Sequence, residues 1–485
     1  MTATTKSAPV APVPDQLGRH SLAVLLVLCG TVFLEGLDVS MMGVALPSIR
    51  ADLGLSTSSL QWVVSAYVLG YGGFVLLGGR AADLLGRRRM FLFWLSVFVV
   101  FSGLGGLAPE GWVLILARFA TGVSAGFLTP ASLSIITTNV PEGAARDKAL
   151  LVYGGAAAGG FSLGMVAGGL LTSIDWRWVF FAPVVVAASL LVLAIRHVPH
   201  DSARPSDRGG VDVAGALSLT GAMLLLVMGV VRAPDLAWSL TAASLGGSVV
   251  LLGLFVVIER HSASPLVRLE ILRSGQLLRA NVGAMLFVGS FVGFQFVAVL
   301  YLQELRGWSA LETGLALLVA GIDAVIAPTL TPWFVQRFGT GRVILGGMLV
   351  GVAAYAAFLP LDADWAYVAM LPALILIGVA FAFVYGPLTI AATDGIDESE
   401  QGLASGLLNA SVQFGAALIL AVVTAVNVTA TGADPTQREL LVGYRTALLV
   451  PLAAVSLAAL ITATGLRRRS TVATAGQCDL ATCAA

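Results

Sequence analysis

The chain has 485 residues, of which 58% are hydrophobic and only 11% are charged, and its formal net charge at pH 7 is zero. Because soluble domains carry about 25% charged residues, the mean hydropathy of +0.92 indicates a protein that lies mostly within a lipid bilayer. Zero net charge argues against a nucleic-acid partner. The cysteines, Cys29, Cys478 and Cys483, show no metal-ligand or disulfide spacing, so we expect no metal site.

Fourteen stretches are apolar and long enough to cross a bilayer, which requires about 20 helical residues. A polar segment, 1–20, precedes the first stretch and no small-residue cleavage site follows it, so we interpret that stretch as an uncleaved membrane helix. The predicted spans are 21–46, 60–79, 90–108, 111–137, 149–172, 177–196, 211–231, 236–258, 280–303, 311–335, 342–361, 365–392, 402–428 and 443–466. The sequence therefore predicts an all-α integral membrane protein.

Basic residues set the predicted orientation, because Lys and Arg collect in the cytoplasmic loops of membrane proteins. If the N-terminus is cytoplasmic, 20 of the 27 Lys and Arg residues lie in cytoplasmic segments and six in external segments. Arg118 alone lies inside a span. We therefore expect both termini to be cytoplasmic.

The first span contains two acidic residues, Glu35 and Asp38. An ionised carboxylate in hydrocarbon costs at least about 2.5 kcal/mol, which favours a functional use. Three residues apart, the two carboxylates lie near one helix face, where they share protons and titrate as a pair. Burial disfavours the charged form and a nearby cation favours it, so such a site can load and release protons. The alternatives are a structural hydrogen bond for Asp38 and an inert position in a polar crevice for Glu35.

A turn rich in Gly and Arg follows the second span. It reads Gly79-Arg-Ala-Ala-Asp83-Leu-Leu-Gly86-Arg87-Arg88-Arg89. The glycines permit tight turning, and Asp83 can pair with an arginine such as Arg87 or Arg88 to latch one conformation. The alternative is a plain positively charged anchor.

The turn recurs after the tenth span, where Gly339 aligns with Gly86 and Arg342 with Arg89. If the seventh and eighth spans are an insert, each turn follows the second span of a six-helix set, and related halves around a central site are typical of transporters. We predict a cytoplasmic tail at 1–20, an N-terminal half at 21–197, a linker with two inserted spans at 198–275, a C-terminal half at 276–466 and a second tail at 467–485. The alternative is a chance coincidence of Gly and Arg.

Two further charges lie inside spans. Arg118 in the fourth span stays charged at any relevant pH, so it must find an acid or backbone carbonyls, and a permanent structural ion pair is one interpretation. Asp323 lies midway along the tenth span, before Pro328 and Pro332, which permit helix bends. Asp323 could attract a cationic substrate, bind a second proton, or serve as a structural partner across the bundle.

Small and aromatic residues mark other spans. In the fifth span Gly160, Gly164 and Gly168 recur every four residues and make one flat face for close helix contact. Aromatic rings can line a pocket for flat apolar cations, although many face lipid or neighbouring helices. The aromatic candidates for such a pocket are Trp62, Tyr67, Phe291, Phe294 and Tyr385.

The turn from Gly79 to Arg89 resembles the signature loop of the major facilitator superfamily. Three other segments resemble motifs of its fourteen-helix drug:proton antiporters, namely Leu37-Asp38-Val-Ser-Met-Met-Gly-Val-Ala-Leu46-Pro47, Arg118-Phe-Ala-Thr-Gly122-Val-Ser-Ala-Gly126 and Trp176-Arg177-Trp178-Val-Phe180. The spacing of Gly155, Gly164, Gly168 and Gly169 resembles the antiporter motif of these exporters. Met165 stands where the family has proline, which puts the usual helix kink in doubt.

The resemblance implies a major facilitator fold, a proton-coupling or substrate-binding role for Asp38 and a role in proton relay for Arg118. We expect a monomer in a bacterial plasma membrane that exports amphipathic, cationic drugs in exchange for protons. No phosphate-binding Gly-Lys-Ser/Thr loop occurs, so we expect neither ATP drive nor a cofactor. The alternatives are a dedicated exporter of one natural product, and a membrane-embedded enzyme or sensor. The lack of a metal or nucleophile constellation argues against the last.

Overall fold

The computed structural model describes residues 19–140, 144–199, 212–233, 238–262, 265–267, 270–271, 274–394, 396, 401–431 and 435–482. Within these ranges the regular structure is helical throughout, and fourteen segments are long and apolar enough to cross a membrane. Helices are favoured because lipid offers no hydrogen-bond partners to an open backbone. The predicted all-α membrane fold is confirmed. Residues 1–18 of the predicted N-terminal tail lie outside the described ranges.

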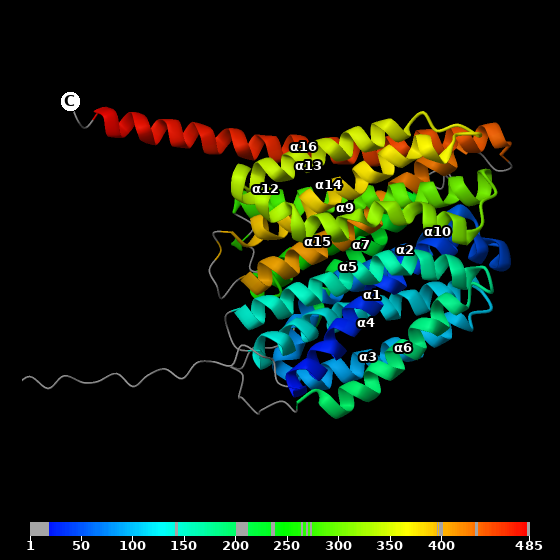
Figure 1. The fold of residues 1–485 in the computed structure, drawn as a ribbon, viewed down its shortest axis with the longest axis horizontal. Coiled ribbons are helices and arrows are strands. Elements are labelled where there is room, and N and C mark those ends of the chain that lie inside the picture. Colours follow the sequence, from blue (N-terminus) through cyan, green and yellow to red (C-terminus); the bar gives the residue numbers. More distant parts are fainter. Residues whose placement is uncertain are drawn as a thin grey trace, which may run out of the picture.

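The N-terminal half consists of six helices that pack against one another. They are α1 (Arg19–Leu53), α2 (Thr57–Leu85), α3 (Arg87–Gly106), α4 (Gly111–Asn139), α5 (Ala144–Thr172) and α6 (Trp178–His197). α1 lies along α5, and α2 lies along α4 (Figure 1). α1 runs seven residues beyond the predicted end at 46, through Pro47, so that Arg50 belongs to its last turn and not to a loop.

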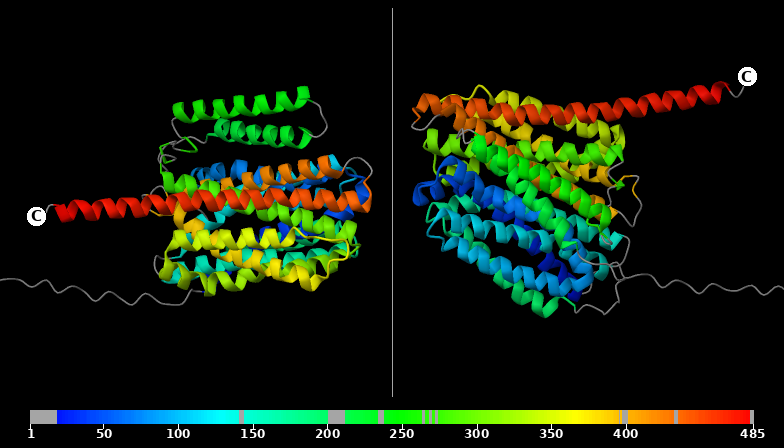
Figure 2. Two further views of the ribbon diagram at one scale, coloured as in Figure 1. Left: turned by 90° about the horizontal axis from the view of Figure 1, so that it is seen from above. Right: turned by 180° about the vertical axis from the view of Figure 1, so that it is seen from behind.

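An inserted pair of helices follows, α7 (Val213–Arg232) and α8 (Trp238–His261). The left view of Figure 2 shows both helices outside the rest of the bundle. α7 contacts α2 of the first half and α15 of the second, whereas the principal neighbour of α8 is α7. The outer face of α8 exposes apolar side chains, including Val249 and Val250 at 69% each, as expected of a surface that faces lipid.

The C-terminal half begins with α9 (Gly275–Leu300), which continues into the π-helical turn η3 (Tyr301–Leu305). The tenth crossing follows as a series of short helices, and the last four crossings are single helices. The series is α10 (Ala310–Leu318), the 3-10 turn η4 (Val319–Ile322), α11 (Asp323–Thr329) and α12 (Thr331–Phe338); the remaining helices are α13 (Thr340–Phe358), α14 (Tyr367–Thr393), α15 (Gln401–Thr431) and α16 (Gln437–Thr482).

The tenth predicted span, 311–335, crosses the bundle but is not one continuous helix. The 3-10 turn η4 contains Gly321 and ends immediately before Asp323. A second break falls at Leu330, between Pro328 and Pro332. Proline has no amide hydrogen to donate to the preceding turn, and the second break falls where two prolines follow each other within four residues. Asp323 is thus the first residue of a short helix.

The two ends of the bundle can be told apart by the chain termini. We call the end where α1 begins and α16 leaves the tail end, and the opposite end, where α1 finishes and α16 begins, the far end. Figure 1 shows α16 continuing beyond the bundle at the tail end. The number of candidate spans is even, so the start of α1 and the end of α16 lie at the same end of the bundle.

Two glycines hold equivalent turns at the tail end. Gly86 joins α2 to α3 with φ of 98°, and Gly339 joins α12 to α13 with φ of 83°. A residue with a Cβ is strained at positive φ, which only glycine adopts freely. Gly86 and Gly339 align in the sequence because each half needs a glycine with positive φ in the turn between its second and third crossings.

Candidate functional site

A buried ion pair joins α1 to α4 in the middle of the N-terminal half. Arg118 Nη1 lies 2.6 Å from Asp38 Oδ2, and the two side chains are 2% and 1% exposed. Arg118 Nε also donates to the Val63 carbonyl at 3.3 Å, and its guanidinium lies 4.5 Å from the centroid of the Tyr67 ring. Arg118 therefore finds both an acid and a backbone carbonyl, as its position inside a span requires.

Glu35 lies one turn nearer the tail end and has a different partner. Thr129 of α4 donates a hydrogen bond to Glu35 Oε2 at 2.8 Å, and the Tyr71 hydroxyl of α2 donates to Thr129 at 2.9 Å. Glu35 is 7% exposed, and its Oε1, like Asp38 Oδ1, is buried with no hydrogen-bond partner in the described chain. We call Glu35, Asp38, Arg118 and Thr129 the buried acidic site. It holds two carboxyl groups against one permanent cation.

Thr129 and Tyr71 were not singled out as site residues from the sequence. The available signal was a hydroxyl in an apolar span, 11 residues after Arg118 and therefore about three helical turns along the same face. Hydroxyls are common in membrane helices, where they often bond to their own backbone. The Thr129 oxygen also lies 3.1 Å from the Ala125 carbonyl, the usual backbone acceptor for such a hydroxyl, so the sequence does not distinguish it from a structural threonine.

A row of aromatic rings crosses from the N-terminal half to the C-terminal half. The ring centroids of Phe161 of α5 and Phe291 of α9 are 6.0 Å apart. Those of Phe291 and Phe381 of α14 are 5.1 Å apart. Phe381 stacks on Tyr385 at 5.3 Å. We call these four residues the aromatic row. It contains two of the aromatic candidates, Phe291 and Tyr385.

The other candidates lie in different surroundings. Tyr67 contacts Arg118, as described above, whereas Trp62 lines a cavity at the far end. Phe294 is 2% exposed and packs against Tyr355 and Phe358 inside the C-terminal half. Asp323 is partly buried on α11, which packs mainly against α14 and α5 and not against the helices of the ion pair. The structure thus brings Glu35, Asp38 and Arg118 together and keeps Asp323 apart.

The residues of the predicted latch fix helices within the N-terminal half. Arg87 donates to Thr138 of α4, and Arg88 Nη2 donates to the Ile195 carbonyl of α6 at 2.7 Å. A Cβ on Gly79 would meet Pro130 at an ordinary 3.7 Å. The Asp83 side chain lies outside the described part of the structure, so an ion pair of Asp83 stays a prediction.

The glycines of the fifth span lie in three kinds of surroundings. A Cβ at Gly164 would lie 2.7 Å from the Leu37 carbonyl oxygen of α1, and one at Gly168 would lie 2.6 Å from Met41 Cα. Gly169 approaches α10 instead, at 2.7 Å from the Ala310 oxygen, and Gly155 has nothing within 4 Å. α5 is one uninterrupted helix, as the replacement of the motif proline by Met165 allows.

The far end is closed by contacts between the halves. Arg50 Nη1 lies 2.8 Å from both carboxylate oxygens of Glu304, and the Tyr444 hydroxyl donates to Glu304 Oε2 at 3.3 Å. Gln303 Nε2 donates to the Val44 carbonyl at 2.9 Å. Gln303 and Glu304 belong to the π-helical turn η3, a geometry often found at functional sites. We call Arg50, Glu304 and Tyr444 the far-end gate.

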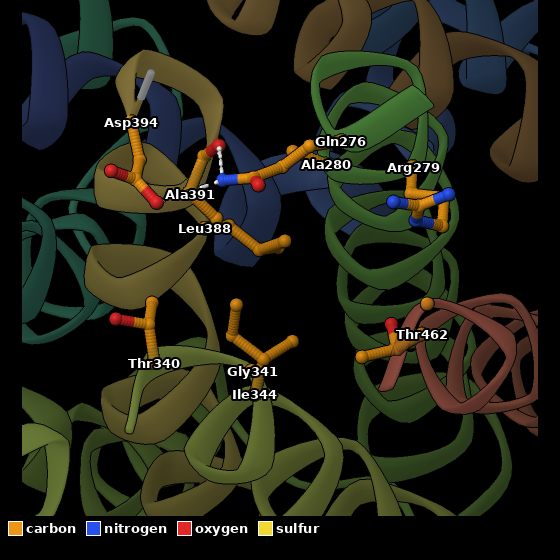
Figure 3. Close-up of a pocket in the computed structure, with 11 residues that line it drawn as sticks. Gln276, Arg279, Ala280, Thr340, Gly341, Ile344, Leu388, Ala391, Asp394 and Thr462 are labelled. Atoms are coloured by element: carbon orange, nitrogen blue, oxygen red, sulfur yellow. Dashed lines mark hydrogen bonds between the residues drawn. The ribbon is translucent and has the colours of Figure 1, made fainter. Parts of the chain in front are cut away.

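Two cavities lie at opposite ends. The far-end cavity has a volume of about 620 Å³ and is lined by residues of both halves and of α7, including Arg50, Trp62, Arg232, Glu304 and Tyr444. The other cavity has about 120 Å³ and lies at the tail end inside the C-terminal half (Figure 3), where Gln276 donates to the Ala391 carbonyl and to Asp394. Pockets that hold drug-sized ligands measure about 300–1,000 Å³, so of these two cavities the first has that size.

Two helical halves, an inserted hairpin and a buried ion pair at mid-depth define a polytopic membrane transporter. The model of the Major Facilitator Superfamily matches residues 28–420, and the chain belongs to that superfamily. The chain is 34% identical over 419 residues to the cephamycin export protein CmcT of Amycolatopsis lactamdurans, covering 85% of this chain and 86% of that protein. It is 35% identical over 420 residues to the puromycin resistance protein pur8 of Streptomyces alboniger, covering 84% and 82%.

A crystal structure of the nucleoside transporter NupG matches with a TM-score of 0.65 at 12% identity, over 92% of this chain and 99% of that chain. At this identity the likeness concerns the fold alone. The family predicted from the four sequence motifs is confirmed by these matches.

Proposed function

We propose that the protein exports amphipathic, cationic, drug-like compounds from the cytoplasm of a bacterium, in exchange for protons and without enzymatic activity. The superfamily, and relatives named for the export of or resistance to antibiotics, support drug export. The observation that carries proton coupling is the buried acidic site, where Asp38 is paired to Arg118 and Glu35, three residues away, has only a hydroxyl as its partner.

The chemistry of the site suits an exchange of charges. A buried carboxylate without a cationic partner is costly, and either a proton or a cationic substrate removes that cost. Glu35 has one neutral hydrogen-bond donor and an unpaired oxygen, so proton and substrate compete for the same group. Asp38 and Arg118 neutralise each other until a proton on Asp38 frees the guanidinium. Binding of one species therefore promotes release of the other.

The conformation fits the first stage of export. We place the tail end in the cytoplasm, because the basic residues gather there. The far-end gate then separates the buried acidic site from the outside, and the far-end cavity is a vestibule for release. Opening requires the halves to part at Arg50 and Glu304, which lie on opposite sides of the boundary between them. No cofactor takes part, and one chain contains both halves and the complete site.

Transport by everted membrane vesicles tests the proposal. The vesicles come from a host that lacks its own drug pumps, and their lumen is made acidic. They should take up a fluorescent cation, and addition of that cation should release protons from the lumen. Dissipation of the gradient should stop both signals. Uptake that persists without a gradient, or that requires ATP, would contradict the proposal.

A dedicated exporter of one natural product is a second candidate. It is favoured by the relatives at 34% and 35% identity, each of which is named for one antibiotic. A resistance panel of chemically unrelated compounds separates the two candidates. Protection against several classes supports the broad exporter, and protection against one compound alone supports the dedicated one.

Removal of the gate ion pair should favour the conformation that is open at the far end. The Arg50 and Glu304 side chains are 34% and 20% exposed, so we expect their pairing to contribute about 1 kcal/mol or less. For Glu304→Gln, a cysteine at Ser59, which lines the far-end cavity, should then react up to about fivefold faster with a membrane-impermeant maleimide. The exchange Arg50→Glu with Glu304→Arg is the matched control and should restore the slow reaction. Equal rates in all three proteins would contradict the role of the gate.

A further inference from the structure

We propose that the inserted hairpin binds a proton of its own, which Asp212 and Glu259 share at the tail end. This proton lets the connection between α8 and α9 pack on the hairpin, and its loss releases the connection. Asp212 caps α7 and Glu259 belongs to α8, whereas the buried acidic site lies on α1 and α4. The inference goes beyond the proposed export function and does not depend on it.

The two carboxyl groups meet over Gly215, in the first turn of α7. A Cβ at Gly215 would lie 3.0 Å from Glu259 Oε1 and 3.1 Å from Asp212 Cγ. Asp212 and Glu259 are 8% and 5% exposed. Two acidic side chains therefore converge on one buried space, which stays free because Gly215 has no side chain to fill it.

Each carboxyl group uses one oxygen and leaves the other without a partner. The Gly215 amide donates to Asp212 Oδ1 at 2.7 Å, and the Val267 amide donates to Glu259 Oε2 at 3.1 Å. Asp212 Oδ2 and Glu259 Oε1 are buried with no hydrogen-bond partner within the ranges that the structure describes. The ion pairs found in these ranges involve other acids. No basic side chain among the described residues therefore balances the two carboxylates.

A single proton fits this site better than a metal ion does. A hard cation such as Ca²⁺ takes about six to eight oxygen ligands, whereas the two carboxyl groups offer one free oxygen each. A proton on Glu259 Oε1 supplies a donor for Asp212 Oδ2, so one proton satisfies both unpartnered oxygens. Without it, two like charges would be buried together with little water to solvate them. Such a pair retains one proton and titrates as a unit.

Other charges have little influence on this site. Asp212 is the charged group that acts on Glu259, and α15, which packs on α7, has no charged residue. The described charged side chains on the other elements around the tail end of the hairpin are exposed to solvent, which screens them. They are Arg80 of α2, Arg260 and His261 of α8, and Glu270 of the connection.

The proton keeps the connection in place by keeping its underside dry. Leu266 and Val267 of the connection are 7% and 3% exposed, and both belong to the apolar cluster that includes Phe255 of α8 and Leu277 of α9. If both carboxyl groups were charged, water would have to reach them, and lifting Leu266 and Val267 admits it. The connection is therefore packed while the proton is bound and becomes solvated as the pH rises.

The hairpin itself is anchored elsewhere, on α2 and α15. Thr220 of α7 packs so closely on Gly73 of α2 that a Cβ there would lie 2.9 Å from Thr220 Cβ. Val227 and Val231 of α7 belong to the same apolar cluster as Phe414 of α15. Because these contacts do not involve the connection, the connection can leave while α7 and α8 stay in place. The proton thus controls how tightly the hairpin is linked to α9, the first helix of the C-terminal half.

A thiol in the connection reports its release. In the full chain in membrane vesicles, Cys29, Cys478 and Cys483 are replaced by Ser, and the reaction of Leu266→Cys with the membrane-permeant N-ethylmaleimide is followed from about pH 6 to about pH 9. At each pH the rate is divided by that of the same thiol combined with Glu259→Gln, which cancels the ionisation of the thiol.

We expect this ratio to be near one at the lower pH and to rise about tenfold at the higher pH, because the glutamine amide can donate to Asp212 at every pH. A ratio that stays near one throughout would overturn the proposal. A tenfold ratio already at the lower pH would overturn it as well, since no proton would then be held.

Two matched variants locate the effect. Asp212→Asn keeps a good N-cap for α7 and removes one of the two charges, so its reaction should depend on pH only as that of Glu259→Gln does. Glu270→Gln removes an exposed acid of the same connection and should keep the full response of the unaltered protein. Loss of the response in Glu270→Gln, or its persistence in Asp212→Asn, would contradict the assignment to this pair.

Infrared spectroscopy detects the proton with Leu266 left unaltered, so the test does not depend on the folding of the cysteine variant. The difference between the spectra of the unaltered protein and of Glu259→Gln at pH 7 should contain the carbonyl band of one protonated carboxyl group. Absence of this band would overturn the proposal. If Ca²⁺ slowed the thiol reaction tenfold at the higher pH, the ligand would be a metal ion, and the proton would be ruled out.

Discussion

The variant Asp38→Asn is expected to lose substrate-driven proton release completely. It removes a titratable group at mid-depth and leaves Arg118, 2% exposed, without its carboxylate at 2.6 Å. Breaking a buried ion pair on one side costs about 3–5 kcal/mol, so the free energy of unfolding should fall as well. Proton release on addition of substrate to everted vesicles measures the first effect, and denaturant unfolding of the purified protein measures the second.

Two further variants separate coupling from structure. Asp38→Glu keeps the charge and should retain part of the proton release. The double variant Asp38→Asn with Arg118→Gln removes both buried charges, so it should regain much of the lost stability and still release no protons. If the pair were only structural, the double variant would transport as well as the unaltered protein. That result would contradict the assignment of Asp38 to proton coupling.

The variant Gly168→Ala is expected to destabilise the N-terminal half by about 3 kcal/mol, the upper part of the range for overpacking. Its Cβ would lie 2.6 Å from Met41 Cα and 3.0 Å from the Met41 oxygen, and backbone atoms cannot rotate away as a side chain can. α1 would have to move away from α5, which would also disturb Asp38 one turn before Met41. The midpoint of thermal unfolding in detergent measures the effect, with size-exclusion chromatography used to monitor the loss of folded protein.

The matched control lies on the same helix. Gly154→Ala adds the same methyl group where nothing lies within 4 Å, and Ala is favoured over Gly inside a helix by about 0.5–1 kcal/mol. We therefore expect Gly154→Ala to be neutral or slightly stabilising. Helix propensity acts alike at both positions, so an equal effect of the two variants would contradict the close packing of Gly168 on α1.

Much of the architecture could be predicted because membrane helices are recognised in a sequence by their length and hydropathy. The fourteen crossings were predictable for this reason, and the alignment of Gly86 with Gly339 identified the repeat, since both turns need the same positive φ. Asp38 and Arg118 were each conspicuous as charges inside spans. Their pairing across 80 positions of sequence is a property of the packed helices and could not be predicted from either residue alone.

Other features escaped prediction for physical reasons. Arg50 and Glu304 resemble ordinary charges near the membrane surface, and only the meeting of α1 with η3 makes them a gate. Gly155 and Gly168 are identical in sequence, yet one faces open space and the other faces the Met41 backbone. Hydropathy likewise does not show that the tenth crossing is broken, because Ala310–Thr329 as a whole is apolar enough to cross a membrane.

The contact of Thr220 with Gly73 has a consequence for the transport cycle. Side chains of α7 pack on both α2 and α15, but the tightest approach, that of Thr220 to the α2 backbone, ties the hairpin to the N-terminal half. When the halves rock against each other, α7 and α8 would travel with α1–α6, and sliding would occur on the α15 side. The two moving bodies would then be unequal, eight crossings against six, and the lighter body would turn further in the membrane.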